Sequence, residues 1–392
     1  MYALHFLCKS GEVSQMTIQH RPEIKDLQPY RPGKPIADVK REYGLTHVVK
    51  LASNENPLGY SDQVGEAIRQ ALDHLSLYPD GNCTDLKNAL AAKFGLHPSQ
   101  ILPSGGSDEM VDMISKAYVN PGDEVIIADV TFPRYISTAK MMGGTPVVVP
   151  LKEFTYDLES MYEAITDKTK LIWLCNPNNP TGTMFGEKAL LEFLDKVPAH
   201  IMVIYDEAYN EYVTREDYPK EAYKLINDYP NVLVMRTFSK IYGLAALRIG
   251  YTMANEEIIT ALNKIRNPFN VSSIAQMAAI AALSDQDFVA KAYRLNQEGK
   301  EYIYHAFDEM GITYASSEAN HIFFNCQYDT QKIFSEMQKR GVIIRPMFDT
   351  YARVSIGTME ENQLFVHTLK EVFTILEAKK ESACGCDCCT CK

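Results

Sequence analysis

The chain has 392 residues, more than one ordinary hydrophobic core holds, so we expect one large domain and a smaller one. Its content of 46% apolar and 23% charged residues is typical of a globular protein in water. The net charge of −11 argues against nucleic acid or an anionic membrane as a partner. No apolar run is long enough to span a bilayer. We therefore predict a cytoplasmic location.

The first part of the chain mixes extended backbone with helical patterns. Residues 1–28 show no clear periodicity and are predicted to form an extension. Residues 29–35 contain three prolines, each of which biases the residue before it away from helix. A strand over 48–52 leads into the turn-forming residues 53–59. Helical patterns over 62–75 and 84–94 then flank a turn that presents Tyr78.

From residue 105 onward, helical and strand patterns alternate. We predict helices over 107–118, 133–142, 186–196 and 255–265, and strands over 124–129, 146–149, 170–175, 201–206, 231–235 and 249–253. Several strands are continuous apolar runs, which indicates a mostly parallel α/β sheet covered on both faces. Ligands of such sheets bind at the carboxyl ends of the strands. After a helical region over 271–310, a second, smaller α/β pattern follows, with strands over 321–325, 342–345 and 352–356 and helices over 330–340 and 359–377.

The segment 236–248 combines an amine with groups that bind phosphate. Lys240 follows the strand 231–235, where a fixed nucleophilic amine could meet a ligand. The hydroxyls of Thr237 and Ser239 and the guanidinium of Arg248 suit a phosphate monoester. A lysine that forms a Schiff base beside a phosphate clamp suggests pyridoxal phosphate, although an ordinary turn after a strand also fits this segment taken alone.

Two further strands end in polar residues that such a ring could use. The strand 170–175 runs into a loop with two Asn-Pro pairs, where Asn179 can offer an amide donor. Asp206 ends the next strand, and a buried acid there requires a cation such as a protonated pyridine nitrogen. Tyr209 lies three residues later and could donate to the phenolic oxygen of the ring. Taken singly, Asp206 also fits a helix N-cap.

Residues 104–109 and 131–135 add weaker signals. Gly106 and Ser107 open the helix 107–118, so their backbone N–H groups could hold a phosphate, although Ser107 and Asp108 also fit a plain N-cap. Phe132 could stack on a cofactor ring, or it could simply pack in the core.

Five of the nine cysteines lie between Cys384 and Cys391. Such a density of thiols could bind a soft metal, but the segment lacks the separated ligand pairs of a zinc site. We therefore predict no metal site and an unstructured tail over 379–392. The remaining cysteines are predicted to be reduced thiols.

Together, and in this order, these elements resemble the fold-type I aminotransferases that depend on pyridoxal phosphate. The resemblance runs from about residue 30 to residue 373, and its most specific parts are residues 178–182, 206–209 and Ser239-Lys240 with Arg248. Finer motifs at 30–34, 54–59, 78–80, 106–109, 236–240 and 357–362 are similar to those of the histidinol-phosphate aminotransferase family.

The resemblance implies an α/β fold of type I, with a mostly parallel seven-stranded sheet in the large domain and a smaller α/β domain. It divides the chain into an extension (1–28), a segment joining the small domain (29–60), a large cofactor-binding domain (61–268), a small C-terminal domain (269–378) and the cysteine-rich tail (379–392). It implies an exchange of the amino group between L-histidinol phosphate and 2-oxoglutarate in histidine biosynthesis, with imidazole acetol phosphate and L-glutamate as products.

The resemblance also implies a role for each site residue. Lys240 would carry the cofactor and move a proton, Asp206 would pair with the ring nitrogen, and Asn179 and Tyr209 would hold the phenolic oxygen. The implied cofactor site also contains Gly106, Ser107, Asp108, Phe132, Thr237, Ser239 and Arg248.

For the substrate, the resemblance implies that Arg353 binds the carboxylate of glutamate or the phosphate of histidinol phosphate, assisted by Arg345 and Tyr30. Asn54 is also expected to contact substrate. Tyr78 would reach the site of a second subunit, which implies a homodimer. The segment between Arg345 and Arg353 is shorter than is usual in the family.

Other functions fit parts of the same pattern. An aromatic (Tyr/Phe) aminotransferase and a pyridoxal-phosphate decarboxylase of a phosphorylated amino acid share most of the motifs. A non-enzymatic regulatory module is disfavoured because no helix-turn-helix or basic segment is attached and the surroundings of Lys240 are complete. A metal carrier that uses the cysteine tail is the remaining alternative.

Overall fold

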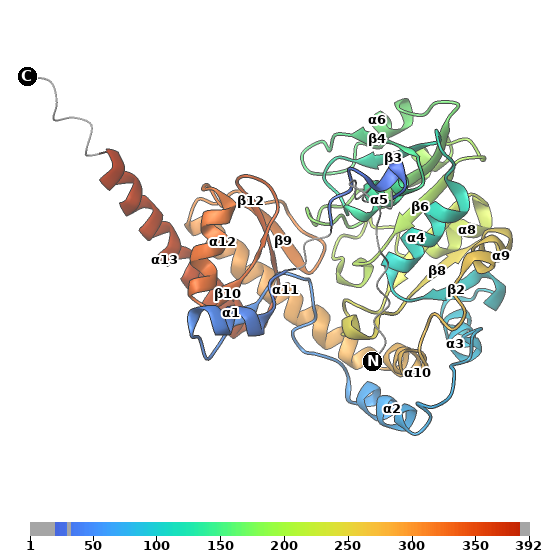
Figure 1. Ribbon diagram of the computed structural model, residues 1–392, viewed down its shortest axis with the longest axis horizontal. Coiled ribbons are helices and arrows are strands. Elements are labelled where there is room, and N and C mark those ends of the chain that lie inside the picture. Colours follow the sequence, from blue (N-terminus) through green and yellow to red (C-terminus); the bar gives the residue numbers. More distant parts are fainter. Residues whose placement is uncertain (1–19, 30–32, 385–392) are drawn as a thin grey trace, which may run out of the picture.

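The computed structural model of the chain describes residues 20–29 and 33–384, with side chains as far as residue 379. The described residues form a larger body around a seven-stranded sheet and a smaller body around short strands, joined by the long helix α11 (Gln286–Glu309) (Figure 1). The predicted α/β fold with a large mostly parallel sheet is confirmed. No helix within the described ranges has the length and apolar character needed to cross a membrane.

The large sheet has one antiparallel strand among seven. In spatial order its strands are β2 (Ile101–Ser104), β8 (Gly250–Ala254), β7 (Val232–Thr237), β6 (Met202–Asp206), β5 (Thr169–Cys175), β3 (Glu124–Ala128) and β4 (Thr145–Val149). β8 runs antiparallel to both of its neighbours, and the other pairs are parallel. The sequence patterns do not indicate β2, which contains Pro103. Proline is tolerated there because β2 lies at the edge of the sheet.

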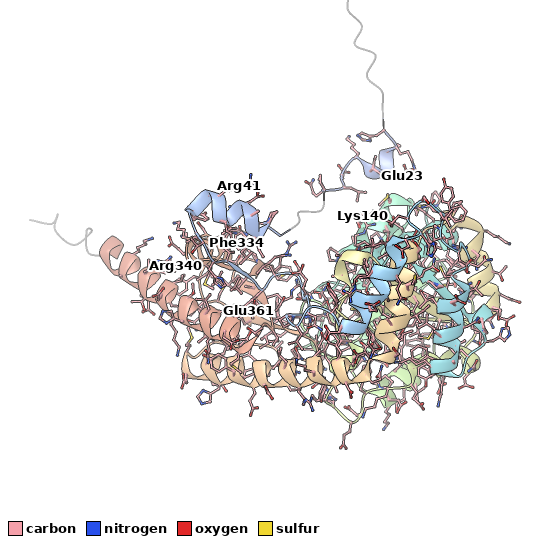
Figure 2. All side chains as sticks on the ribbon, turned by 90° about the horizontal axis from the view of Figure 1, so that it is seen from below. Glu23, Arg41, Lys140, Phe334, Arg340 and Glu361 are labelled. Atoms are coloured by element: carbon pink, nitrogen blue, oxygen red, sulfur yellow. The ribbon has the colours of Figure 1, made fainter. Side chains whose placement is uncertain are left out.

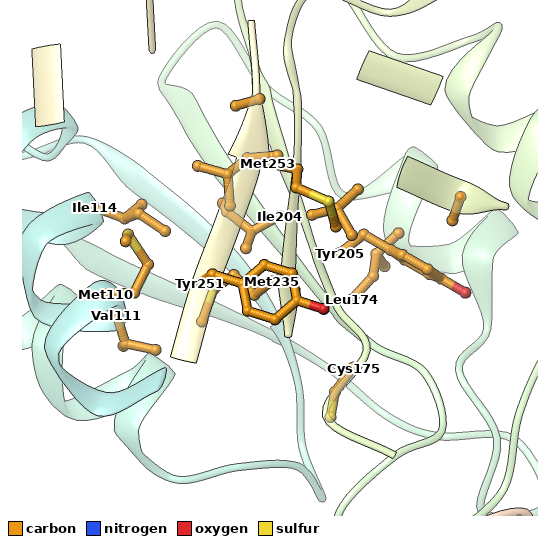
Figure 3. Close-up of a cluster of buried hydrophobic side chains, with 14 of the residues drawn as sticks. Met110, Val111, Ile114, Leu174, Cys175, Ile204, Tyr205, Met235, Tyr251 and Met253 are labelled. Carbon is orange, nitrogen blue, oxygen red and sulfur yellow. The ribbon is translucent and has the colours of Figure 1, made fainter. Parts of the chain in front are cut away.

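Helices cover the central strands of this sheet. Every residue of β6, β7 and β8 is buried, as the apolar runs in the sequence predict. Figure 3 shows Met110, Val111 and Ile114 of α4 (Ser107–Tyr118) beside Tyr251 and Met253 of β8. Each large side chain buried in this way contributes about 1.5–3 kcal/mol to folding. The strand ends that carry polar residues are therefore fixed by a rigid core.

Four of the other eight α-helices that the structure describes in the larger body begin where the sequence offers a capping side chain. Ser61, Asp157, Asn255 and Ser272 each accept a hydrogen bond from a backbone N–H in the first turn that follows. The eight helices are α2 (Asp62–Leu72), α3 (Thr84–Phe94), α5 (Arg134–Met141), α6 (Leu158–Glu163), α7 (Glu187–Leu194), α8 (Leu225–Asp228), α9 (Glu256–Ile265) and α10 (Ser273–Ser284). The predicted helical region over 271–310 is interrupted at Asp285, whose side chain caps α11.

The smaller body contains two short sheets. β11 (Arg345–Pro346), β12 (Tyr351–Ser355) and β9 (His321–Asn325) form one, and β1 (Val49–Lys50) with β10 (Val342–Ile343) forms the other. The predicted single strand over 342–345 is thus divided between two sheets. α12 (Thr330–Lys339) and α13 (Met359–Cys384) pack beside them.

The segment before residue 60 joins the smaller body. β1 pairs with β10, and α1 (Ile36–Tyr43), which the sequence patterns do not indicate, packs against α12; Arg41 and Phe334 mark the two helices in Figure 2. The short helix η1 (Pro22–Ile24) instead contacts α5 of the larger body, where Glu23 lies near Lys140 (Figure 2). The five domain limits given above stay predictions.

Candidate active site

A cavity of about 350 Å³ opens where β5, β6 and β7 end. Its lining includes ten of the residues that the sequence predicts for a cofactor site: Ser107, Asp108, Phe132, Asn179, Asp206, Tyr209, Thr237, Ser239, Lys240 and Arg248. The parallel strands bring these residues together because their carboxyl ends meet at one edge of the sheet.

Lys240 lies on a tight turn after β7. The hydroxyl of Thr237 accepts a hydrogen bond from Ser239 N at 3.0 Å, and Gly243 N donates to Lys240 O at 3.0 Å. Gly243 has a φ of +73°, and a Cβ there would lie 1.8 Å from the Gly59 carbonyl oxygen, so only glycine fits. The turn holds the amine at a defined place in the cavity.

The amine of Lys240 is a weaker base than usual. Its Nζ donates to Ser53 O at 3.4 Å and lies 5.6 Å from the centre of the Tyr209 ring. Burial, followed by the positive charge of Arg353, lowers the pKa of Lys240 to about 8. A substantial fraction of neutral, nucleophilic amine is therefore present near neutral pH.

Asp206 is a buried acid at the end of β6, with 4% of its surface exposed. Tyr135 donates its hydroxyl to Asp206 Oδ2 at 2.7 Å, and Ala208 N donates to Oδ1 at 3.1 Å. Burial raises the pKa of Asp206 to about 6, because these hydrogen bonds offset only part of the desolvation. The Tyr135 ring stacks on Trp173 at 4.3 Å. A positively charged partner in the cavity would stabilise this carboxylate.

Tyr209 is held by a residue from the other side of the cavity. Asn54 Nδ2 donates to the Tyr209 hydroxyl oxygen at 3.0 Å and to His321 Nδ1 at 3.0 Å. Burial raises the pKa of Tyr209 far above its usual value, so its hydroxyl keeps its proton. Asn54 itself is 1% exposed and does not line the cavity, so it contacts Tyr209 rather than the cavity space.

Asn179 is joined to Arg353 of β12. Arg353 Nη1 donates to Asn179 Oδ1 at 2.6 Å, and Nη2 donates to Ala52 O at 2.7 Å. The loop before Asn179 is fixed by Asn178, whose amide donates to Val130 O and Thr181 Oγ1. Arg353 is therefore connected to the cavity through its hydrogen bond to Asn179, which lines the cavity.

Arg345 and Arg353 are direct partners in the antiparallel pair of β11 and β12. Opposite residues of such a pair place their side chains on the same face. The short segment between them is therefore a hairpin that brings the two arginines together.

The N-terminus of α4 and Arg248 form a corner for an anion. Gly106 has a φ of +83°, and a Cβ there would lie 2.6 Å from Arg248 Nη2, so the backbone approaches the guanidinium closely. Arg248 Nη1 donates to Ser239 Oγ at 3.5 Å, and Nη2 lies 3.5 Å from Asp108 Oδ2. The helix dipole and the guanidinium both favour a bound phosphate here.

Five of the predicted site residues that the structure describes are not part of the cavity lining: Asn54, Tyr78, Gly106, Arg345 and Arg353. Tyr78 is 83% exposed and stacks on Phe269 at 4.7 Å, away from the cavity lining. Tyr30 lies outside the described residues, and so does the thiol cluster of the cysteine tail. The described part of the chain holds no group of three or more His, Cys, Asp or Glu residues that could bind a metal ion.

Besides the lining residues Ser53, Ala208 and Ala245, the sequence motifs miss four residues of the site. Tyr135 and Cys175 line the cavity, and Glu55 lies at its edge, where it pairs with Lys50 at 2.9 Å. His321 lies behind Tyr209, with the ring centres 5.0 Å apart. Tyr135 lies only three residues after Phe132 in the sequence, and this gives a signal for Tyr135 alone.

Comparisons with known proteins agree with this geometry. Residues 46–369 match the family model described as aminotransferase class I and II. The chain is 49% identical to a histidinol-phosphate aminotransferase of Caldicellulosiruptor saccharolyticus, over 90% of this chain and 99% of that protein. It is 48% identical to one of Moorella thermoacetica, over 90% of this chain and 92% of that protein.

A solved structure is similar over nearly the whole chain. The crystal structure of histidinol-phosphate aminotransferase from Sinorhizobium meliloti in complex with pyridoxal-5'-phosphate superposes with a TM-score of 0.85 and 30% sequence identity. It covers 92% of this chain, and 99% of that structure is matched.

The raised pKa of Asp206 predicts a loss of stability of the ligand-free protein with increasing pH. Between the usual value of 3.8 and the folded value of about 6, the folded state keeps a proton that the unfolded state has released. The free energy of unfolding therefore falls as pH rises through this window. We expect the stability of wild type relative to Asp206→Asn to fall by roughly 2.4 kcal/mol from about pH 4 to about pH 7 in urea titrations. A flat or rising difference would contradict this assignment.

Proposed function

We propose a function from the premise that this chain belongs to the class I and II aminotransferase family, and within it to the histidinol-phosphate aminotransferases. The chain moves the amino group of L-histidinol phosphate to 2-oxoglutarate, with pyridoxal phosphate as cofactor. The observation that carries the proposal is the cavity that unites the amine of Lys240, the buried acid Asp206 and the anion corner at Arg248. The relatives named above support the choice of substrate.

The cavity fits pyridoxal phosphate at both ends. Asp206 is a buried carboxylate whose protein partners donate only neutral hydrogen bonds, so a protonated ring nitrogen suits it. At the other end, Ser107, Ser239 and Arg248 offer donors and positive charge to a phosphate. Phe132 lines the same cavity, where a ring could stack on it.

When bound, pyridoxal phosphate supplies an aldehyde that bonds to amines and a ring that withdraws electrons from the substrate carbon. Lys240 would hold this group through Nζ, and its amine, once free, would take the proton from the substrate Cα. The lowered pKa of Lys240, about 8, keeps the amine ready for this transfer. Asp206 would keep the ring nitrogen protonated, while Tyr209 and Asn179 would donate to the phenolic oxygen.

The two arginines of the β11–β12 hairpin explain how one site accepts two substrates. Glutamate offers a carboxylate and histidinol phosphate a phosphate monoester, and a planar guanidinium binds two oxygens of either group. Arg353 is held by Asn179 and Ala52, and Arg345 lies opposite it. We assign the common anionic end of both substrates to this pair, with Tyr30 assisting.

The active unit is proposed to be a homodimer in which Tyr78 of each chain completes the site of the other. Among the described residues, Tyr78 is the most exposed of the large apolar side chains, and Leu75 and Leu77 beside it are also exposed. Exposed apolar clusters of this kind mark interfaces. The cytoplasmic location also stays a prediction.

The substrate assignment is tested by a parallel assay of purified protein with pyridoxal phosphate. Histidinol phosphate with 2-oxoglutarate should give glutamate with a kcat/KM at least about tenfold above that for tyrosine or phenylalanine, because a phosphate monoester offers three oxygens to the two arginines where the carboxylate of an amino acid offers two. Equal or better turnover of the aromatic amino acids would contradict the assignment. So would release of carbon dioxide from a phosphorylated amino acid.

Arg353→Lys tests the anion site. A lysine keeps the charge but loses the planar pair of donors, so KM should rise roughly 10- to 100-fold for both histidinol phosphate and glutamate. Steady-state kinetics with Arg215→Lys as a control give the comparison, because Arg215 pairs with Asp217 at a half-exposed position outside the cavity lining. A rise for only one of the two substrates would refute a shared anion site.

Mixed dimers test the role of Tyr78. Lys240→Ala and Tyr78→Ala chains with different tags are coexpressed, and the heterodimer is purified through both tags. If Tyr78 acts across the interface, one site of the heterodimer has both residues and the activity recovers to about half that of wild type. If Tyr78 acts within its own chain, both sites lack one residue and the heterodimer stays as inactive as the parents.

A further inference from the structure

His321 is a buried histidine that none of the assigned roles uses. It is the first residue of β9 and is completely buried. Along β9, Ile322 and Phe324 belong to the core of the smaller body, so His321 faces the opposite side. There its ring meets the ring of Tyr209 edge to face, with centres 5.0 Å apart. The contacts of this polar side chain therefore indicate its role.

The hydrogen bonds around Asn54 fix the role of each atom. Ser355 Oγ accepts from Asn54 N at 2.8 Å and donates to Asn54 Oδ1 at 2.9 Å. With Oδ1 placed to accept from Ser355, the two protons of Nδ2 point to the Tyr209 oxygen and to His321 Nδ1, each at 3.0 Å. His321 Nδ1 must accept, so the ring carries its proton on Nε2.

The position of His321 is set by the sheet of the smaller body. His321 and Ser355 are direct partners in the antiparallel pair of β9 and β12, so they reach Asn54 from one face. Asn320 adds a third contact by donating to Asn54 O at 3.0 Å. Asn54 has a φ of +55°, and these contacts hold it in that left-handed conformation.

The surroundings keep the ring neutral. Burial, followed by the positive charges of Arg353 and Lys240, lowers the pKa of His321 well below its usual value. The backbone groups of Asn178 and Pro180 act in the opposite direction but do not outweigh these effects. Among the described residues no atom accepts a hydrogen bond from Nε2. A second ring proton would have to lie on Nδ1, where it would face the amide protons of Asn54. A neutral ring keeps Nδ1 available as an acceptor near neutral pH.

We propose that His321 is a positioning residue: by accepting one amide proton of Asn54, it directs the other to the Tyr209 oxygen and leaves the Tyr209 hydroxyl proton free to point into the cavity. This inference rests on the proposed function, because the group that would receive the proton is the phenolic oxygen of pyridoxal phosphate. Without the acceptor at Nδ1, one amide proton of Asn54 would be buried and unpaired, and the amide would reorient.

The direct test is a pH titration of the visible absorption band of the protein loaded with pyridoxal phosphate. His321→Phe keeps an aromatic ring against Tyr209 but removes the acceptor. A hydrogen bond from Tyr209 stabilises the deprotonated phenolic oxygen, so its weakening should raise the midpoint of the band by about half a pH unit or more. His321→Asn, whose Oδ1 can replace Nδ1, should restore the midpoint to within about 0.2 unit of wild type.

A matched control separates this effect from a general loss of packing. His305→Phe changes a histidine on α11 whose side chain is 76% exposed, and it should leave the midpoint unchanged. A midpoint that stays at the wild-type value in His321→Phe would overturn the proposal. So would an equal shift in His321→Phe and His321→Asn, because that outcome indicates packing rather than hydrogen bonding.

A second measurement uses only the wild-type chain and needs no folded variant. In ¹⁵N-histidine-labelled protein without cofactor, the nitrogen chemical shifts of His321 should show a neutral ring with its proton on Nε2 throughout about pH 6 to 8. A proton on Nδ1, or titration within that range, would overturn the proposal. Neither readout requires turnover of histidinol phosphate, so a wrong substrate assignment and a wrong role for His321 give different results.

Discussion

The burial of the Asp206 carboxylate is the constraint on which the rest of the site depends. A carboxylate that is 4% exposed at the end of a fully buried strand is costly, and its pKa of about 6 measures that cost. Tyr135, held against Trp173, supplies one donor but no charge. A cationic ring nitrogen supplies the missing charge, so the same desolvation that destabilises the empty site favours the bound cofactor. The core of the large sheet provides the rigidity that this requires.

The cavity is completed by the smaller body, which holds the groups of the large sheet from the other side. Asn54 binds the hydroxyl of Tyr209, and Arg353 binds the amide of Asn179. Both contacts join a residue attached to the short sheets with a residue at a strand end of the large sheet. Any shift of the smaller body would therefore change the hydrogen bonds available to the phenolic oxygen and to the anionic end of the substrate together. Substrate binding and cofactor chemistry therefore depend on the same few contacts between the two bodies.

The sequence predicts the parts of the site that follow from local patterns and motifs. Lys240, Asp206, Asn179 and Arg248 each follow a recognisable strand or loop, and all four line one cavity. What the sequence does not reveal depends on pairings between distant segments. The sequence patterns do not predict β2, because Pro103 is untypical of a strand and is tolerated only at the sheet edge. The two arginines of the short hairpin come together only through the register of β11 and β12. The link from His321 to Tyr209 passes through Asn54, 267 residues away from His321 in the chain, and no local pattern indicates it.

The account is tested most directly by an absorption spectrum of the purified protein, recorded before and after histidinol phosphate is added without any keto acid. The account predicts a visible band from pyridoxal phosphate bound to Lys240, and this band should give way to the near-ultraviolet absorption of the aminated cofactor as the first half of the transfer occurs. A band that histidinol phosphate leaves unchanged, but that phenylalanine or tyrosine removes, would contradict the substrate assignment while keeping the role of Lys240. The absence of any band after addition of pyridoxal phosphate would contradict the account as a whole.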